Sequence, residues 1–225
     1  MKASLTTNYF IPAAVAMIIL ATSLGASPRA TLREGLRGDT RVFLLGDSVF
    51  DNNIYVPEGA SVGDLLRRKQ KQVRILAHDG ATLPDLRRQI LRIPIMADRR
   101  STYIFVSVGG NDILRAYRGL RKTNMGPLRR ILKSYRRFLE SLMEKFKDST
   151  IILANLYYPT SPAYRNFYPL IRKWNIDLER IARDNSLQVL HLDKVLVSPP
   201  DFTHDIEPSP RGSRSIVKHM LKLLR

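Results

Sequence analysis

A serine directly after an apolar run is the first residue of this chain that could perform covalent chemistry. The run is RVFLL, residues 41–45, and it is followed by Gly46, Asp47 and Ser48. Glycine, aspartate and serine are ordinary turn residues, so this segment could be no more than a turn or the start of a helix. A serine hydroxyl becomes a nucleophile when a base removes its proton, and a histidine oriented by a carboxylate does this near neutral pH. The remaining sequence therefore has to be searched for such a pair.

Three further groups of polar residues could complete a site around Ser48. The segments HDG (residues 78–80) and GGND (residues 109–112) each follow an apolar run, and DFTH (residues 201–204) stands near the C-terminus. DFTH carries a carboxylate and an imidazole three residues apart. In a serine-dependent mechanism, His204 would shuttle the proton and Asp201 would orient His204.

Simpler interpretations exist for several of the neighbouring polar residues. Asn111 could cap a helix, and Asp112 is better explained as a cap or a structural hydrogen-bond partner than as a catalyst. His78 is more typical of a loop residue than of a base, and His191 and His219 are expected to be structural or solvated. Carboxylates and histidines do not cluster at the spacing of metal ligands, so we expect no metal and no cofactor.

Five short, β-rich apolar runs alternate with longer segments of helical periodicity, which predicts a parallel sheet covered by helices on both faces. In such sheets, ligands bind beyond the carboxyl ends of the strands, where the polar groups described above stand. The five predicted strands are RVFLL (41–45), VRILA (73–77), TYIFVSV (102–108), TIILANL (150–156) and LQVLHL (187–192).

Helices are predicted between the strands from start signals and from the spacing of apolar residues. Ser61 with Asp64, and Thr82 with Asp85, each fit a capping box at the start of a helix. The other expected helices cover residues 128–146, 165–184 and about 213–224.

Three of the motifs, in this order and each after a predicted strand, resemble the sequence blocks of the SGNH, or GDSL-type, hydrolase superfamily of esterases and lipases. The motifs are GDS at 46–48, Gly80 within HDGAT, and GGND at 109–112. The resemblance covers residues 41–225 and implies a three-layer α/β/α fold with a flavodoxin-like, doubly wound sheet of about five parallel strands. It also implies that Ser48 is the nucleophile, and that the oxyanion hole consists of the backbone N–H groups of Ser48 and Gly80 and the side-chain amide of Asn111.

The C-terminal motif departs from the family pattern, in which a proline follows the catalytic histidine and a glycine stands five residues after it. Here Asp205 follows His204, and Gly212 lies eight residues beyond it. One interpretation is a three-residue insertion, with Asp201 and His204 as the working pair. In the other, EPSPRG (residues 207–212) is the motif, Glu207 stands in place of the histidine and the base is altered or missing. We prefer the first interpretation.

Composition and charge limit the other properties of the chain. Its 225 residues include no cysteine, which excludes disulfides, thiolate zinc sites and cysteine nucleophiles. The formal net charge of +17 should attract acidic polysaccharides or anionic lipid surfaces. Residues 1–28, with the apolar run from Phe10 to Ala26, resemble a signal peptide or a membrane anchor, which predicts export. Residues 29–40 are expected to be a linker, and 41–225 one domain.

The leading functional prediction is a serine hydrolase that cleaves carboxylic esters through an acyl-serine intermediate, acting on an acylated glycan or lipid. An acyltransferase would use the same machinery. A second class is a catalytically impaired module that binds acidic glycan or anionic lipid. Specific nucleic-acid binding would rest on charge alone, since the chain has no recognised nucleic-acid-binding motif.

Overall fold

The computed structural model describes residues 40–70, 72–94, 101–118 and 124–224. The expected export segment, residues 1–28, lies outside these residues, as does all but the last residue of the expected linker. Within the described part of the chain, no helix is both long enough and apolar enough to cross a bilayer.

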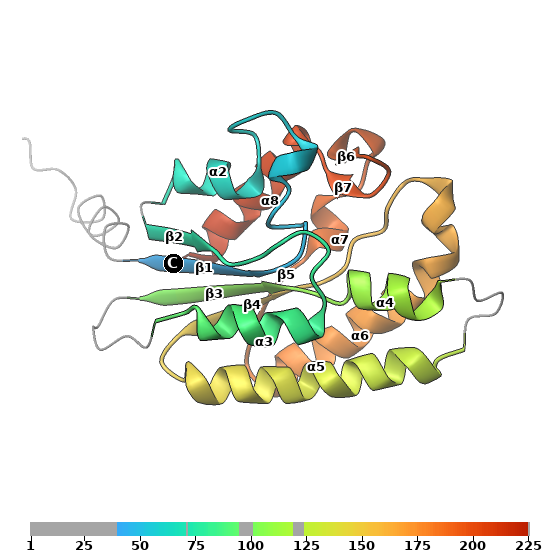
Figure 1. Cartoon of the computed structure of the whole chain (residues 1–225), viewed down its shortest axis with the longest axis horizontal. Helices are drawn as coiled ribbons and strands as arrows, with labels where there is room; N and C mark the ends of the chain where they lie inside the picture. The colour runs from blue at the N-terminus through green and yellow to red at the C-terminus, as the bar shows by residue number, and fades with distance from the viewer. Residues whose placement is uncertain (1–39, 71, 95–100, 119–123, 225) are drawn as a thin grey trace, which may run out of the picture.

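A sheet of five parallel strands forms the centre of the molecule (Figure 1), in the order β2-β1-β3-β4-β5. All five predicted apolar runs contribute a strand, and every neighbouring pair is parallel. This order is that of a flavodoxin-like, doubly wound sheet, so the predicted fold class is confirmed. The strands are β1 (Arg41–Gly46), β2 (Gln72–Ile75), β3 (Thr102–Ser107), β4 (Thr150–Ala154) and β5 (Gln188–Leu190).

Side chains of β1 alternate between two hydrophobic cores, one on each face of the sheet. Phe43 and Leu45 belong to a core shared with α3, α4, α5 and α6, whereas Val42 and Leu44 belong to a core shared with α2, α7 and α8. Burial on both faces explains why the strands read as continuous apolar runs. The helices are α2 (Val62–Arg67), α3 (Leu83–Leu91), α4 (Gly110–Tyr117), α5 (Gly126–Lys145), α6 (Tyr168–Asp184), α7 (Leu192–Val195) and α8 (Pro210–Leu223).

Two of the predicted helix starts are present. The Ser61 hydroxyl accepts a hydrogen bond from the Asp64 backbone N–H at the start of α2, with an oxygen–nitrogen distance of 3.1 Å. At the start of α3, the backbone N–H of Thr82 donates to the Asp85 carboxylate over 2.8 Å, which completes a capping box. These caps fix where the chain enters each helix after the loops that carry the site.

The helices differ from the sequence prediction in several places. Helix α5 starts at Gly126 rather than at residue 128, and α6 starts at Tyr168 rather than at residue 165. Helix α4 starts at Gly110, directly after β3, and had no predicted counterpart because neither Gly109 nor Gly110 is a strong start signal. Helix α8 begins at Pro210 rather than near residue 213. Ser209 caps it by accepting a hydrogen bond from the N–H of Gly212 over 3.1 Å.

Short elements complete the chain near the carboxyl edge of the sheet. Figure 1 shows the β6–β7 hairpin beside α8, away from the strands of the main sheet. The elements are the 3-10 helices η1 (Asn53–Tyr55), η2 (Pro162–Phe167) and η3 (Pro199–Asp201), and the antiparallel strands β6 (Phe202–Thr203) and β7 (Glu207–Pro208).

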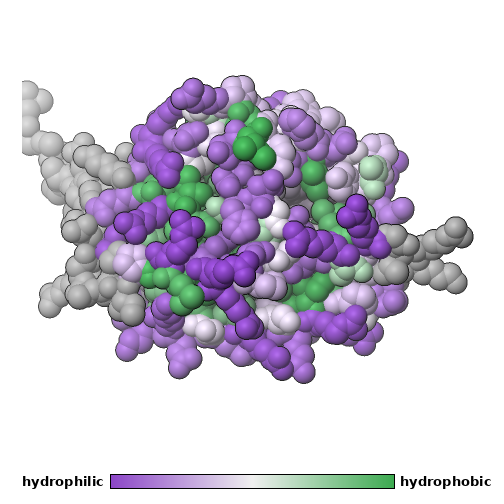
Figure 2. Space-filling model, viewed as in Figure 1, coloured by the Kyte–Doolittle hydropathy of each residue, from purple (hydrophilic) through white to green (hydrophobic). Residues whose placement is uncertain are grey.

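The molecular face shown in Figure 2 is mostly hydrophilic, with small and separate hydrophobic areas. Scattered exposed apolar side chains are ordinary for a folded domain. The large exposed ones among the described residues are Ile54, Leu91, Ile176 and Val197.

Candidate active site

The end of β1 requires glycine because it lies against the end of β3. Gly46 has a φ of 138°, and a Cβ atom on it would stand 2.0 Å from the carbonyl oxygen of Ser107. The amide of Gln89, a buried side chain on α3, pairs with both backbone groups of Gly46: its Oε1 accepts from the N–H over 2.7 Å, and its Nε2 donates to the carbonyl over 2.9 Å. The residue before the GDS turn is therefore held in one conformation.

Asp47 is buried and fixes the turn that presents Ser48. Its carboxylate accepts hydrogen bonds from the Ser107 hydroxyl at 3.0 Å and from the Val49 backbone N–H at 3.3 Å. Burial raises the pKa of Asp47 to about 7; these two hydrogen bonds oppose the rise, and the negative charge of Glu207 adds to it. The acid of the GDS motif thus organises the turn, and its protonation changes near neutral pH.

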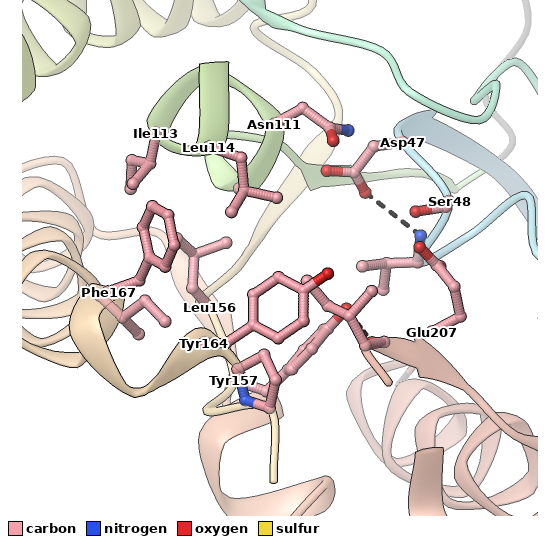
Figure 3. Close-up of a pocket in the computed structure, with 15 residues that line it drawn as sticks. Asp47, Ser48, Asn111, Ile113, Leu114, Leu156, Tyr157, Tyr164, Phe167 and Glu207 are labelled. Atoms are coloured by element: carbon pink, nitrogen blue, oxygen red, sulfur yellow. Dashed lines mark hydrogen bonds between the residues drawn. The ribbon is translucent and has the colours of Figure 1, made fainter. Parts of the chain in front are cut away.

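Ser48 lines a pocket at the carboxyl ends of the strands, which is where the sequence predicted a ligand site. In Figure 3, Asn111, Asp47, Ser48 and Glu207 lie on one side of this pocket, and apolar side chains form the opposite side. The labelled residues of the apolar side are Ile113, Leu114, Leu156 and Phe167. The pocket therefore combines a polar side that contains a hydroxyl with an apolar wall.

Asn111 is the residue that the family resemblance assigns as an oxyanion donor. It is in the first turn of α4 and lines the pocket, and its Nδ2 donates to the carbonyl of Ala81 over 3.1 Å. This bond ties the loop after β2 to the start of α4. The structure therefore brings Asn111 and Ser48 to one pocket, while the function of Asn111 as an oxyanion donor stays a prediction.

Gly80 belongs to the loop that Asn111 holds, and it has a φ of 70°. A Cβ atom at this position would meet only Nη2 of Arg115, 3.9 Å away, so the left-handed backbone rather than crowding favours glycine here. Its carbonyl accepts a hydrogen bond from that same Arg115 nitrogen over 2.9 Å. Whether its N–H stabilises an oxyanion also stays a prediction.

Asp112 is a structural hydrogen-bond partner, as its position in the sequence suggested. Both carboxylate oxygens lie 3.2 Å from the backbone nitrogen of Leu83, which donates to them at the start of α3. Burial raises the pKa of Asp112, although the hydrogen bond from Leu83 opposes this. The aspartate of GGND therefore connects α4 to α3 rather than facing Ser48.

The Asp201 carboxylate is occupied by groups of its own loop. It accepts hydrogen bonds from the Val197 N–H at 3.1 Å and from the N–H and hydroxyl of Ser198 at 2.9 and 2.8 Å, and it pairs with Nε of Arg211 at 3.1 Å. Burial alone would raise the pKa of Asp201, but the hydrogen bonds and the arginine outweigh it, and the pKa is lowered. Asp201 thus stabilises η3 and the start of α8.

His204 lies in the tight turn between β6 and β7, with a φ of 46°, and its side chain is exposed. Its Nδ1 is 3.1 Å from the Thr203 hydroxyl, and its ring centre is 5.5 Å from that of Tyr55. The structure therefore does not bring Asp201 and His204 together with Ser48 as the sequence analysis expected. The reason is that the chain reverses at His204, so the residues after this turn reach the pocket instead. The catalytic assignment of this pair stays a prediction without support from the geometry.

Glu207, three residues after His204, is the residue that faces Ser48. It lines the pocket from β7, and Figure 3 shows its carboxylate beside the Ser48 hydroxyl. Burial raises the pKa of Glu207; the neighbouring Ser48 side chain lowers it, and the charge of Asp79 raises it further. The arrangement matches the alternative interpretation, in which EPSPRG is the C-terminal motif.

Histidine does not occur among the residues that line this pocket in the described part of the chain. His78 is exposed, with its Nδ1 3.0 Å from the carbonyl oxygen of Asp79. His191 pairs with Glu179 at 3.1 Å, and His219 contacts the Ser215 carbonyl within α8. The polar side of the pocket is therefore a hydroxyl with two carboxylates and an amide.

The sequence matches a family model described as the GDSL-like Lipase/Acylhydrolase family over residues 44–214. The chain belongs to this family. The match runs from β1 into α8 and so includes Ser48, Gly80, Asn111 and Glu207. It places the chain among ester-hydrolysing enzymes. A search of curated proteins gave no significant match.

Solved structures of the same fold share little sequence with this chain. A lipolytic protein of the G-D-S-L family from Veillonella parvula has 18% identity and a TM-score of 0.62, with 82% of this chain and 97% of that chain covered. An acetylxylan esterase from Geobacillus stearothermophilus has 19% identity and a TM-score of 0.57, with 83% and 94% covered. A psychrotrophic esterase from a Pseudoalteromonas species, inhibited by monoethylphosphonate, has 14% identity and a TM-score of 0.58, with 82% and 95% covered.

Proposed function

We propose that this protein hydrolyses carboxylic esters through an acyl-serine intermediate on Ser48. The observation that carries the proposal is the Ser48 hydroxyl at the carboxyl end of β1, in a pocket whose polar side also contains Asn111 and Glu207. In the first half-reaction, the serine oxygen bonds to the acyl carbon and the alcohol leaves. In the second, water attacks the same carbon and the carboxylic acid leaves.

The apolar wall of the pocket supports an ester whose acyl group is hydrophobic. Apolar side chains can hold such a chain while the carbonyl points to the polar side, where a hydrogen-bond donor could stabilise the oxyanion. The aliphatic and phenylalanine residues of this wall are Ile113, Leu114, Leu156, Phe167 and Ile171.

The alcohol part of the substrate is proposed to belong to an acylated glycan or to a lipid. The acetylxylan esterase of similar fold acts on a glycan ester, which supports the first option. The formal charge of +17 supports an anionic glycan or lipid surface. The charge of Asp79 acts on Glu207, and the Asp79 N–H donates a hydrogen bond to the carboxylate of Asp51, so such a surface would contact the basic residues elsewhere on the domain.

A fluorophosphonate probe tests the nucleophile without knowledge of the substrate, and the phosphonate inhibition of the Pseudoalteromonas esterase supports this choice. The probe is expected to label the purified domain once, on Ser48. Ser48→Ala should remove the label without changing the circular dichroism spectrum, whereas Ser134→Ala, at an exposed serine on α5, should leave it intact. Labelling that persists in Ser48→Ala would contradict the proposal.

A non-catalytic binding module is the second candidate, because no histidine lines the Ser48 pocket in the described residues. This candidate predicts binding to anionic vesicles or acidic polysaccharide without any covalent labelling. An acyltransferase would form the same acyl-serine and pass the acyl group to an added alcohol instead of water. Product analysis in the presence of an alcohol separates transfer from hydrolysis.

A further inference from the structure

The Glu207 carboxylate lies beside the Ser48 hydroxyl in the pocket, and one of its oxygens is buried without a hydrogen-bond partner among the described residues. Both residues line the same pocket, and the Ser48 side chain lowers the pKa of the carboxylate. The buried oxygen is Oε2. A buried carboxyl oxygen without a donor is costly and uncommon, so its retention requires an explanation.

The backbone on both sides of Glu207 is held by side chains from other elements. The Tyr157 hydroxyl, from the segment after β4, donates to the carbonyl of Ile206 over 2.8 Å. The Asn52 amide, from the segment after β1, donates to the carbonyl of Pro208 over 2.9 Å. Glu207 is thus fixed between two long-range hydrogen bonds, which is the precision that a reacting group requires.

The start of α8 is fixed at a set spacing after Glu207. A Cβ atom on Gly212 would stand 2.3 Å from the carbonyl oxygen of Asp201, so glycine is required five residues after Glu207. The Ser209 hydroxyl donates to the carbonyl of Pro200 over 2.6 Å and accepts from the N–H of Gly212. The close contact that requires glycine at position 212 therefore fixes the first turn of α8, in which this glycine stands five residues after Glu207. His204 stands eight residues before this glycine.

We propose that Glu207 is the general base and acid of the reaction on Ser48. This inference rests on the proposed function. In acylation, Glu207 takes the hydroxyl proton as the serine oxygen bonds to the acyl carbon, and it gives that proton to the departing alcohol oxygen. In deacylation, it takes a proton from the attacking water and returns it to the serine oxygen as the acyl–serine bond breaks. Protons and bonds balance over the cycle, and no further reactant is needed.

A carboxylate with an ordinary pKa is a weak base near neutral pH. The surroundings of Glu207 increase the basicity of its carboxylate. Burial raises its pKa, which makes the carboxylate a stronger base. Other carboxyl and phenol groups also act on the site, and none of them carries a positive charge. They are Asp47, Tyr55, Asp79, Tyr157 and Tyr164.

The test measures Ser48-dependent hydrolysis of a p-nitrophenyl ester from pH 4.5 to 9. Glu207→Gln keeps the shape of the side chain and removes the base, so kcat/KM should fall by about 100-fold or more and the acid limb of the pH profile should disappear. Glu140→Gln, on the exposed face of α5, is the matched control and should leave both unchanged. His204→Ala is expected to cost less than about tenfold.

Folding must be checked separately, since glutamine at position 207 could act through structure. Burial disfavours the charged form of Glu207, so Glu207→Gln should unfold at the same or a higher temperature than the wild type at pH 8. If this variant does not fold, Glu207→His replaces it. That variant should keep Ser48 labelling and move the acid limb toward about pH 6.5, the ordinary pKa of histidine.

The outcomes separate this inference from the proposed function. Full activity in a folded Glu207→Gln variant, an unmoved acid limb in Glu207→His, or a large loss in His204→Ala alone would overturn the assignment of Glu207 while Ser48 remains the nucleophile. A wild-type protein with neither Ser48-dependent hydrolysis nor labelling would overturn the proposed function and this inference together.

Discussion

Replacing Asp47 with asparagine should change how the stability of the protein depends on pH. Asp47 is 4% exposed, and its carboxylate accepts hydrogen bonds from Ser107 and Val49. Asparagine keeps an oxygen that can accept the same two bonds, so Asp47→Asn removes the titration with little change in packing. The substitution therefore isolates the effect of a buried charge beside the serine turn.

The sign and size of the effect follow from the pKa of Asp47, which rises from 3.8 to about 7 on folding. The folded state holds the proton more tightly, so this contribution to stability is fully present below pH 3.8 and is lost as the pH rises through 7. At 1.36 kcal/mol per pH unit, the difference between these two pKa values corresponds to about 4 kcal/mol. The asparagine side chain does not titrate, and so the variant should not lose this stability.

Urea unfolding at pH 4, 6 and 8 measures the effect, with the fluorescence of Trp174 as the signal. Trp174 is the single tryptophan and is fully buried. The measured quantity is the free energy of unfolding of Asp47→Asn minus that of the wild type. This difference should increase by several kcal/mol from pH 4 to pH 8. A difference that stays constant across this range would refute the reasoning, because it would mean that Asp47 titrates alike in the folded and unfolded chains.

Other predictions follow from the same contacts. Asn52→Ala should lower the free energy of unfolding by roughly 3 kcal/mol in urea titrations, because Pro208, Ser213 and Val62 each lose a buried hydrogen bond. Asp85→Asn should destabilise by about 1 kcal/mol at pH 7 and by progressively less as the pH falls below 3.8, since the pKa of Asp85 is lowered by the Thr82 N–H and its stabilisation is lost at low pH. The segment 29–225, which is the linker with the domain, has 36 basic and 20 acidic residues, a net charge of +16, so it should bind anionic vesicles in flotation assays at about 50 mM salt and release them near about 500 mM.

The sheet could be predicted from sequence because its strands are buried on both faces. Residues such as Val42 and Phe43 point to opposite sides and are both buried, which leaves a continuous apolar run that only a covered strand explains. The capped helices were predictable for a similar reason, since Ser61 and Thr82 act on residues three positions away. Structural features that depend on residues close in sequence can therefore be predicted from the sequence.

The site was predicted less completely because its decisive contacts are long-range. Gln89 pairs with Gly46 across 43 positions, and no sequence signal marks a buried glutamine as the partner of a strand end. The choice between His204 and Glu207 depended on where the chain reverses, and the left-handed backbone of His204 sets that reversal. Side chains in turns are often polar, so a pattern such as DFTH indicates a catalytic pair equally well when, as here, Asp201 accepts hydrogen bonds from its own loop.

The most direct test of the account is the detection of an acyl group on Ser48. The protein is mixed with a p-nitrophenyl ester, quenched in acid within the first turnover, digested and analysed by mass spectrometry. If Ser48 is the nucleophile, the peptide containing Ser48 gains the mass of the acyl group, and Ser48→Ala neither gains this mass nor hydrolyses the ester. Hydrolysis at an undiminished rate by Ser48→Ala, or an acyl group found only on another residue, would contradict the central claim.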